Sequence, residues 1–380
     1  METFMGIDFG TSTTIAAVYA DKKAAIIRSK TGEEIMPSYV AFTPDGKMQV
    51  GRSAQGRRVI DPTNTLFSFK RILGRNTSSP EVRAFSKQYP FTLEGAKDEA
   101  PRFVTRAGKL SAQEVCSYLL AQLHEAPAVT GQDIGRVCMT VPVSFRKEQR
   151  TAAISAAIGA GFRRVDVLEE PCAAALACMR EDPREQTVMV YDLGGGTFDA
   201  TVLLWTGTRF KVLGLGGDSY LGGDDITARC ATWVADEVLK RFNWNIRTSE
   251  TSWQRLLMTC DQVKVLLSVS QSQEISLAGV DEVLKDKSIT LTREQMEKMC
   301  MDLVQRTFLI CDETLRSAST NARKIQSVVL SGGCCHMPFI REAVKAYFGQ
   351  TPRMQLPPDK VVALGAAIHA GEQSVMNRVF

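Results

Sequence analysis

The chain has 380 residues, of which 44% are hydrophobic and 23% are charged, and 46 Lys and Arg against 42 Asp and Glu leave a net charge of +4. This balance is typical of a globular protein of two or three domains and excludes disordered, collagen-like and disulfide-framework proteins. A charge this weak, with no basic run, argues against nucleic acid or a membrane as a partner.

The chain opens with Met1, Glu2 and Thr3, without a basic stretch before an apolar one, so we expect no secretory signal. No uninterrupted apolar run of about 18 residues is present, so we expect no membrane-spanning helix. The ten cysteines form no CxxC pair. We therefore expect them to be small buried hydrophobes in a reducing, cytoplasmic compartment.

Strand, turn and helix signals in the first half begin with two apolar strands, 4–9 and 14–19, around the turn Gly10-Thr11-Ser12-Thr13. Ser111 and Glu114 form a capping box at the start of a helix over 110–123. The other expected elements of this half are a strand over 137–142 and helices over 149–161 and 171–179.

The second half repeats this opening, with strands over 188–193 and 198–204 around Gly194-Gly195-Gly196-Thr197. The later expected elements are helices over 228–242, 253–268, 293–317 and 338–348 and a strand over 327–330. Asp8 aligns with Asp192 in this repeat, a separation too long for a solenoid, so we infer a duplicated domain. We expect a first lobe over 1–182, a second over 183–371 and a C-terminal tail over 372–380.

Each glycine-containing turn, preceded by an aspartate at a strand end, has the composition of a phosphate site. Glycine lets the backbone approach a phosphate, consecutive N–H groups bind the anion, and the aspartate can hold hydrated Mg²⁺. One copy is equally well explained as a structural hairpin, but two copies predict hairpins that hold the β- and γ-phosphates, with Mg²⁺ between Asp8 and Asp192. Gly332 and Gly333, after the strand at 327–330, indicate either a plain turn or a close approach to a flat ligand.

Over residues 4–371 the chain resembles the nucleotide-binding (ATPase) domain of the heat-shock protein 70 (DnaK-type) chaperones. The segments that carry the resemblance are 6–12 (GIDFGTS), 64–75 (NTLFSFKRILGR), 141–142 with 149–150, 169–175 (EEPCAAA), 192–199 (DLGGGTFD), 221–225 (LGGDD), and 332–333 with 337–338. Sugar kinases and actins share the fold of this family but lack the segments FSFKR and EPxAAA.

The resemblance implies an α/β, actin-like ATPase fold, in which two lobes from a duplicated mixed-sheet (ribonuclease H-like) domain bind the nucleotide in a central cleft. It also implies binding of ATP or ADP with Mg²⁺ and K⁺, and slow ATP hydrolysis that drives a chaperone cycle. Phosphoryl transfer of this kind depends on positioning and charge neutralisation.

The resemblance gives individual residues roles. Lys70 looks like the catalytic lysine that reaches the γ-phosphate, although one lysine alone would be read as a surface residue. Glu170 is similar to the carboxylate beside the Mg²⁺ water shell and is coupled to the relay residues Pro142 and Arg150; an acid at a helix N-terminus explains it as well. Asp8, Asp192 and Asp199 resemble the acids that order the ions.

The remaining matched residues would contact the nucleotide. Those expected at the phosphates are Gly10, Thr11, Ser12, Gly194, Gly195, Gly196 and the catalytic Thr197. Those expected at the nucleoside are Asp261, Lys264, Ser268, Gly332, Gly333, His336 and Asp359. A helix would bring 261, 264 and 268 to one face, but a solvated helix face would have the same pattern.

The sequence departs from the family at several of these positions. His336 replaces an arginine that stacks on adenine, Asp261 replaces a glutamate, and Cys172 replaces a threonine. Adjacent cysteines cannot readily chelate one ion, so Cys334-Cys335-His336 does not indicate a metal site. Asp166 replaces an arginine linked to J-domain contact, which reverses a charge.

The resemblance implies a J-domain co-chaperone and a nucleotide-exchange factor as partners, yet Asp166 makes hydrolysis a firmer expectation than standard co-chaperone control. Peptide substrates would bind through a β-rich domain that follows this segment in the family, and we expect the chain to be the nucleotide-binding part of a longer protein. Two other functions stay open: a nucleotide-binding scaffold without hydrolysis, and a small-molecule kinase of the same superfamily.

Overall fold

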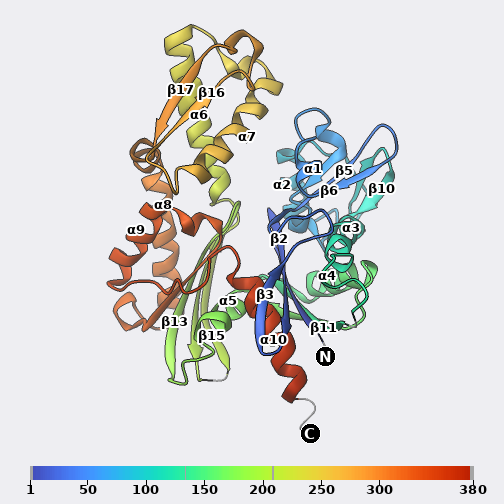
Figure 1. Ribbon diagram of the computed structural model, residues 1–380, viewed down its shortest axis with the longest axis vertical. Helices are drawn as coiled ribbons and strands as arrows, with labels where there is room; N and C mark the ends of the chain where they lie inside the picture. The colour runs from blue at the N-terminus through green and yellow to red at the C-terminus, as the bar shows by residue number, and fades with distance from the viewer. Residues whose placement is uncertain (1–2, 133, 208, 377–380) are drawn as a thin grey trace. The chain divides into compact units, whose positions relative to one another are not determined.

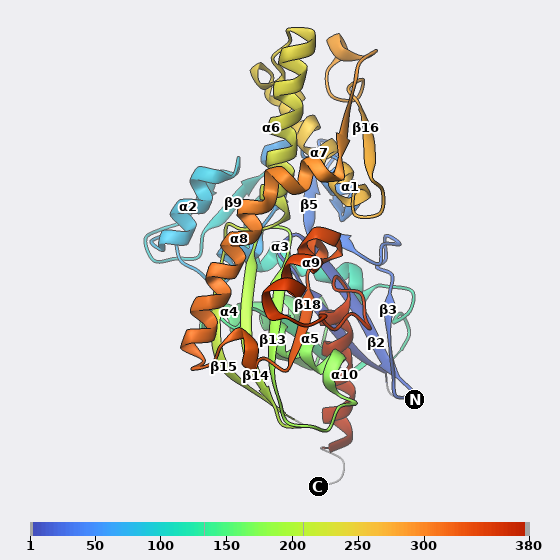
Figure 2. The same cartoon turned by 90° about the vertical axis from the view of Figure 1, so that its left-hand side faces the viewer.

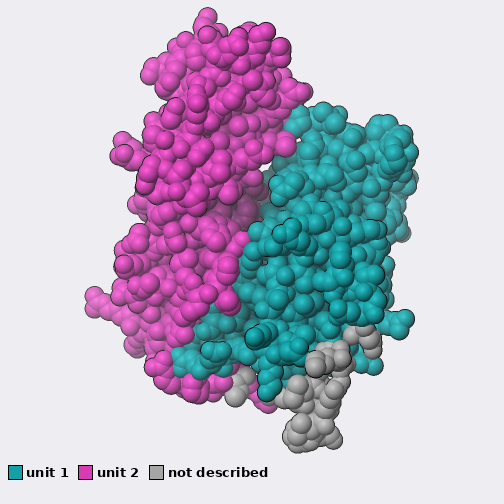
Figure 3. Space-filling view, in the orientation of Figure 1, with its two compact units in different colours: residues 1–182, 360–380 teal, residues 183–359 magenta. Residues whose placement is uncertain are grey.

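The computed structural model describes residues 3–132, 134–207 and 209–376. Residues 377–380 of the expected tail and the first two residues of the chain lie outside the described residues. The chain forms two compact units: Met1–Asp182 with Lys360–Phe380, and Pro183–Asp359 (Figure 3). Within the described residues, no helix combines the length and the apolar character that crossing a membrane requires.

The first unit contains a sheet of apolar central strands covered by helices (Figure 1). Its strands are β1 (Thr3–Phe9), β2 (Thr13–Ala20), β3 (Lys23–Ile27), β4 (Met36–Pro37), β5 (Tyr39–Phe42), β6 (Met48–Val50), β7 (Thr65–Phe67), β8 (Leu93–Glu94), β9 (Arg102–Thr105), β10 (Gly108–Ser111), β11 (Ile134–Val141) and β12 (Val165–Glu169). Its helices are α1 (Arg52–Gln55), α2 (Pro80–Gln88), α3 (Ala112–His124), α4 (Lys147–Gly159), α5 (Glu170–Met179), α10 (Val361–Met376) and the 3₁₀ helices η1 (Pro62–Asn64) and η2 (Phe69–Ile72).

The main sheet of this unit has the strand order β12-β11-β1-β2-β3, in which β1 is parallel to β11 and antiparallel to β2. Helix α10 packs closely on β1, since a Cβ at Gly6 would overlap the backbone of Ala367. Close backbone approach of this kind requires glycine.

The packing of α10 corrects the expected division of the chain. We expected residues 360–371 in the second lobe and a separate tail from Glu372, but Lys360 onward belongs to the first unit and α10 continues to Met376. The sequence expectation was wrong because it followed chain order. A C-terminal helix can return to the first unit when small residues on both surfaces allow close contact, as on α5, where a Cβ at Gly365 would overlap the Ala173 carbonyl.

The second unit has a four-stranded main sheet and a separate two-stranded one. Its strands are β13 (Gln186–Leu193), β14 (Phe198–Trp205), β15 (Phe210–Asp218), β16 (Ser272–Ser276), β17 (Ser288–Thr292) and β18 (Ser327–Ser331). Its helices are α6 (Gly223–Phe242), α7 (Glu250–Leu266), α8 (Arg293–Ser317), α9 (Pro338–Phe348) and the 3₁₀ helices η3 (Ile246–Thr248), η4 (Glu282–Leu284), η5 (Ala322–Lys324) and η6 (Gly333–His336).

The main sheet of the second unit has the order β15-β14-β13-β18, and α8 packs on β14 and β15 (Figure 2). Strand β13 is antiparallel to β14 and parallel to β18. The first unit has the same arrangement, because β1 is antiparallel to β2 and parallel to β11. The repeat seen in the sequence thus corresponds to the same strand order in each unit, and both sheets are mixed.

Most predicted elements are confirmed within a few residues. Helix α8 has the predicted bounds, and α3 begins with the predicted capping box of Ser111 and Glu114. Helix α7 ends at Leu266, so Ser268, which we expected at the end of a helix over 253–268, lies in the turn that follows. All ten cysteines are free and nine of them are buried, which confirms their packing role.

Candidate functional site

The hairpin turn of the first unit, Gly10–Ser12, joins β1 to β2 and is held by a buried serine. Ser38 Oγ donates a hydrogen bond to the Gly10 carbonyl at 2.9 Å, and Ser38 N donates to the Ser12 carbonyl at 2.9 Å. A Cβ at Gly10 would overlap the Thr13 carbonyl, so the turn requires glycine. The structure therefore brings Gly10, Thr11 and Ser12 together at the strand end, as expected.

The half-buried Asp8 precedes this turn near the end of β1. Thr140, on the parallel neighbour β11, has its Oγ1 at 3.5 Å from Asp8 Oδ1. Its position was not foreseen, because strand pairing across more than a hundred residues is invisible in a single sequence.

Lys70 on η2 is the buried cation beside the first hairpin. Its side chain is only 4% exposed, and its Nζ donates to the Phe9 carbonyl and, at 2.8 Å, to Glu170 Oε1. The Nζ also lies 5.2 Å from the ring centroid of Phe9 and 5.6 Å from that of Phe145. The alternative of an ordinary surface lysine is wrong, and the ammonium lies at the end of the strand that carries Asp8.

The two expected relay residues lie on one chain of contacts. Arg150 Nη1 is 2.8 Å from Glu169 Oε1, and its Nε donates to the Phe145 carbonyl at 3.1 Å. Phe145 N in turn donates to the Pro142 carbonyl at 3.1 Å. The arginine therefore pairs with Glu169, the residue before Glu170, a choice of partner that sequence spacing does not resolve.

The second hairpin, residues 194–197, is hydrogen-bonded to the first residues of α6. Gly194 N donates to the Thr197 carbonyl at 3.0 Å and closes the turn. Gly223 N donates to the Gly194 carbonyl at 3.0 Å, and Asp224 N donates to the Gly195 carbonyl at 2.6 Å. Both carbonyls thus point toward the beginning of α6.

Two carboxylates flank this second hairpin. Asp192 on β13 is directly opposite Asp199 on β14, and Ser331 Oγ donates to Asp192 Oδ2 at 2.8 Å. Like charges across a strand pair repel each other, so this pair favours a bound cation or hydrogen-bond donors. The structure therefore brings these two predicted acids together.

Gly332 and Gly333 follow β18 and differ sharply in their surroundings. Gly332 has a φ of +87°, and a Cβ there would overlap the Leu193 carbonyl. Gly332 N donates to the Pro358 carbonyl at 2.9 Å, which places Asp359 beside this junction. A Cβ at Gly333 would meet nothing within 4 Å, so only the first glycine is required by the packing.

His336 and Asp359 were both expected near the nucleoside, and the structure brings them together. His336 Nε2 is 2.7 Å from Asp359 Oδ1, with the histidine side chain 43% exposed. An imidazole fixed on one edge in this way keeps an open ring face, which is the requirement for stacking on a flat ligand.

Lys264 was expected to contact adenosine, but its ammonium is turned into the unit. Its Nζ donates to the Gly223 carbonyl at 3.0 Å, to Thr227 Oγ1 at 2.9 Å and to Asp261 Oδ1 at 2.6 Å. Burial opposes its charge, but Asp261, Cys334 and Asp224 raise the pKa of Lys264 above its ordinary value. All three N–H donors of the ammonium are thus used inside the protein. Ser268 is not part of this cluster.

Cys334 and Cys335 are buried beneath the second hairpin. Cys334 Sγ donates to the Gly194 carbonyl at 3.2 Å, and Cys335 Sγ donates to the Ser331 carbonyl at 3.0 Å. Burial raises the pKa of Cys334 to about 11 and that of Cys335 well above the usual thiol range. Across the described residues, no group of three or more His, Cys, Asp or Glu side chains is arranged to hold a metal ion.

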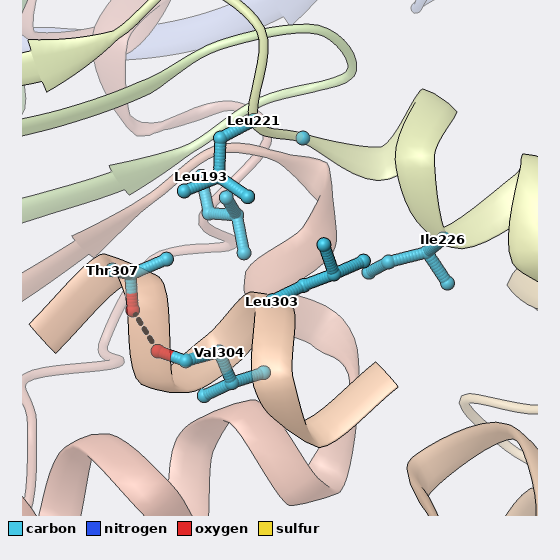
Figure 4. A pocket seen from close by; sticks show the side chains of 7 residues that line it. Leu193, Leu221, Ile226, Leu303, Val304 and Thr307 are labelled. Atoms are coloured by element: carbon cyan, nitrogen blue, oxygen red, sulfur yellow. Dashed lines mark hydrogen bonds between the residues drawn. The ribbon is translucent and has the colours of Figure 1, made fainter. Parts of the chain in front are cut away.

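A small apolar pocket of about 10 Å³ lies next to the second hairpin, between Leu193, Gly222, Ile226 and α8 (Figure 4). Figure 4 also shows Thr307 Oγ1 donating to the Val304 carbonyl, so the hydroxyl at its wall is already satisfied. A space of this size is at the limit of what one water molecule needs and is too small for a nucleotide.

The two sites define an α/β protein with two glycine hairpins, each beside strand-end acids. A family model described as Hsp70 protein matches residues 4–379, so the chain belongs to the Hsp70 family. This confirms the resemblance seen in the sequence. Members of this family are ATP-binding chaperones with the actin-like ATPase fold, bind ATP and ADP with Mg²⁺, and generally work with J-domain proteins and exchange factors.

Proposed function

We propose that the chain binds ATP and hydrolyses it slowly with Mg²⁺, as the motor of a chaperone cycle. The observation that carries this proposal is the ion pair of the buried Lys70 with the half-buried Glu170 at the end of β1. There the Lys70 ammonium also donates to the carbonyl of Phe9, the residue between Asp8 and the hairpin Gly10–Ser12. An ion pair with a buried lysine is costly to desolvate and is weak evidence for stability, so its place beside a glycine turn preceded by an aspartate favours a chemical role.

We assign each residue of the site a separate role in ATP hydrolysis. An ammonium has three N–H donors, and within the described residues Lys70 gives two of them to Phe9 and Glu170. We assign the third to the γ-phosphate, where a fixed positive charge stabilises the charge that develops during transfer. Glu170 orients the ammonium and the attacking water. The hydroxyls of Thr11, Ser12 and Thr197 would donate to phosphate oxygens.

Mg²⁺ usually keeps several waters and binds through one or two carboxylates and substrate phosphates. Asp8 in the first unit, and Asp192 with Asp199 in the second, have the chemistry that such a hydrated ion needs. When bound, the ion neutralises phosphate charge. We assign both hairpins to the phosphates of one nucleotide, with two lobes around it, as the family implies. K⁺ would bind at the same acids.

We assign His336, Asp359 and Gly332 to the nucleoside, and Pro142 and Arg150 to a conformational relay that reports the nucleotide state. Asp166 is paired with Arg136 at 3.1 Å, so the reversed charge at this position is partly neutralised. A J-domain partner at this surface would therefore meet a different charge pattern than in relatives with arginine here. We propose cytoplasmic action with a J-domain co-chaperone and an exchange factor adapted to that pattern.

Phosphate release from ATP by the purified chain tests the proposed function. We expect slow release that requires Mg²⁺, stops after chelation and is indifferent to glucose. ATP binding without any release would instead indicate a nucleotide-binding scaffold. ADP formation that depends on glucose and yields a glucose phosphate would indicate a small-molecule kinase and overturn the proposal.

A further inference from the structure

The two hairpins share a feature that goes beyond their glycines. In each, the carbonyl of the first turn glycine accepts a hydrogen bond from a buried side chain that comes from a distant segment. Ser38 Oγ donates to Gly10 O at 2.9 Å, and Cys334 Sγ donates to Gly194 O at 3.2 Å. Gly10 and Gly194 are the equivalent positions of the repeat, so the same atom is held in both units.

Holding that carbonyl fixes the direction of the next amide. In a planar trans peptide the C=O and the following N–H point in opposite directions. When the Gly194 carbonyl is held toward Cys334 and α6, the N–H of Gly195 is turned away from them. The same geometry turns the N–H of Thr11 away from Ser38. These two amides are the ones that would donate to a phosphate.

The chemistry of Cys334 suits a permanent donor. Burial raises the pKa of its thiol to about 11, so the S–H keeps its proton at neutral pH and donates to the carbonyl. A Cβ at Gly223 would lie 2.8 Å from Cys334 Sγ, so the sulfur also fixes the distance to the first turn of α6. Gly223 N is the second donor to the same carbonyl, at 3.0 Å.

We propose that Cys334 and Ser38 are corresponding positioning residues, each of which aims one hairpin amide at the phosphates by holding the carbonyl before it. This inference rests on the proposed nucleotide binding and assigns Cys334 a role that its neighbours in sequence do not suggest. The loss of either side-chain donor loosens the hold on the peptide, and in the second unit the Gly223 amide then remains as the donor to the Gly194 carbonyl. The looser peptide weakens contacts to phosphate and leaves contacts to the nucleoside intact.

Four variants test this with dissociation constants for ATP and for adenosine. Cys334→Ala and Ser38→Ala remove the donor, whereas Cys334→Ser and Ser38→Cys exchange the donors of the two units. We expect each alanine variant to bind ATP about three- to tenfold more weakly, the worth of one hydrogen bond, with adenosine affinity unchanged. The exchanged variants restore ATP affinity to within about twofold.

Cys311→Ala is the matched control, because Cys311 is a buried cysteine of the same unit on α8 and, within the described residues, makes no hydrogen bond to the hairpin. We expect it to bind both ligands like the unmodified chain. If Cys334→Ala weakens ATP and adenosine equally, the thiol is a packing residue and the inference is wrong. If the alanine variants bind ATP normally, the inference also fails, while the proposed function stands; failure of the unmodified chain to bind ATP would sink the proposed function itself.

Discussion

Within the residues that the structure describes, each unit has one buried lysine near its hairpin, and the two lysines differ in what the ammonium contacts. Lys70 is 4% exposed and donates to a strand-end carbonyl and to Glu170. Lys264 is 6% exposed and donates to Gly223, Thr227 and Asp261, which uses all three of its donors. Burial alone therefore does not mark a catalytic lysine.

The two lysines differ in how many of the three ammonium N–H donors the protein already uses. An ammonium saturated by the protein stabilises the fold, since it ties α7 to the first turn of α6. An ammonium with a donor left for a ligand is available for chemistry. We therefore expect Lys70 to matter for turnover and Lys264 for stability.

The largest effect is expected for Lys70→Ala. Turnover of bound ATP falls by about 100-fold or more, the usual effect of removing one preorganised donor to developing charge. ATP affinity falls only a few-fold, because the hairpins are intact. Single-turnover hydrolysis measures this, with Lys30→Ala as control, since Lys30 is an exposed lysine of the same unit paired with Glu125. A variant that hydrolyses ATP at the original rate contradicts the assignment of Lys70.

Lys264→Met is expected to lower the free energy of unfolding by about 2–3 kcal/mol, because it removes the three hydrogen bonds that the buried ammonium donates to the Gly223 carbonyl, Thr227 Oγ1 and Asp261 Oδ1. Asp261→Asn costs less, since the Asp261 side chain is 48% exposed. Urea unfolding followed by tryptophan fluorescence reports this unit alone, because all four tryptophans, Trp205, Trp233, Trp244 and Trp253, lie within it. If the methionine variant is as stable as the parent, the claim that Lys264 stabilises the fold is wrong.

Gly332→Ala and Gly333→Ala form a matched pair at the end of β18. A Cβ at Gly332 would overlap the Leu193 carbonyl at a positive φ, so Leu193 and Asp192 must shift, and we expect ATP affinity to fall about tenfold. A Cβ at Gly333 meets nothing, and affinity stays within about twofold. Calorimetric titration with ATP compares them. Similar losses in both variants would show that β18 does not position the second hairpin.

The smallest effect concerns pH and the first unit. Burial, with a contribution from Arg136, lowers the pKa of His369 on α10, although Asp166 and Glu169 raise it. The unfolded chain then binds the proton more readily, so stability is constant above about pH 6.5 and declines as the pH falls below it. We expect α10 amides to exchange faster at pH 5.5 than at pH 7, after correction for intrinsic exchange, by about 1 kcal/mol of protection or less. The variant His369→Gln loses this pH dependence, and an unchanged pH dependence would assign it to other groups.

The sequence predicted the parts of this fold that depend on local pattern. The two hairpins, helix α8 and the capping box of α3 follow from short-range signals, and the repeat of Asp8 and Asp192 located both strand-end acids. The family match then confirmed the resemblance that those motifs carry.

The parts that could not be predicted depend on contacts between distant segments. Ser38, Thr140 and Cys334 take their places only once strands and turns far apart in the chain pair with one another. The inward turn of Lys264 depends on the Gly223 carbonyl and the Thr227 hydroxyl at the start of α6. The return of α10 to β1 depends on the match of two small-residue surfaces. None of these has a signature in a window of neighbouring residues.

The central claim is that both hairpins are phosphate sites that share Mg²⁺, and the Mg²⁺ dependence of ATP binding in Asp8→Asn and Asp192→Asn tests it most directly. We predict that each variant loses about tenfold or more of its ATP affinity when Mg²⁺ is present and much less when Mg²⁺ is chelated. If Asp192→Asn binds ATP with Mg²⁺ as tightly as the unmodified chain, the second hairpin is not a phosphate site and the account is wrong.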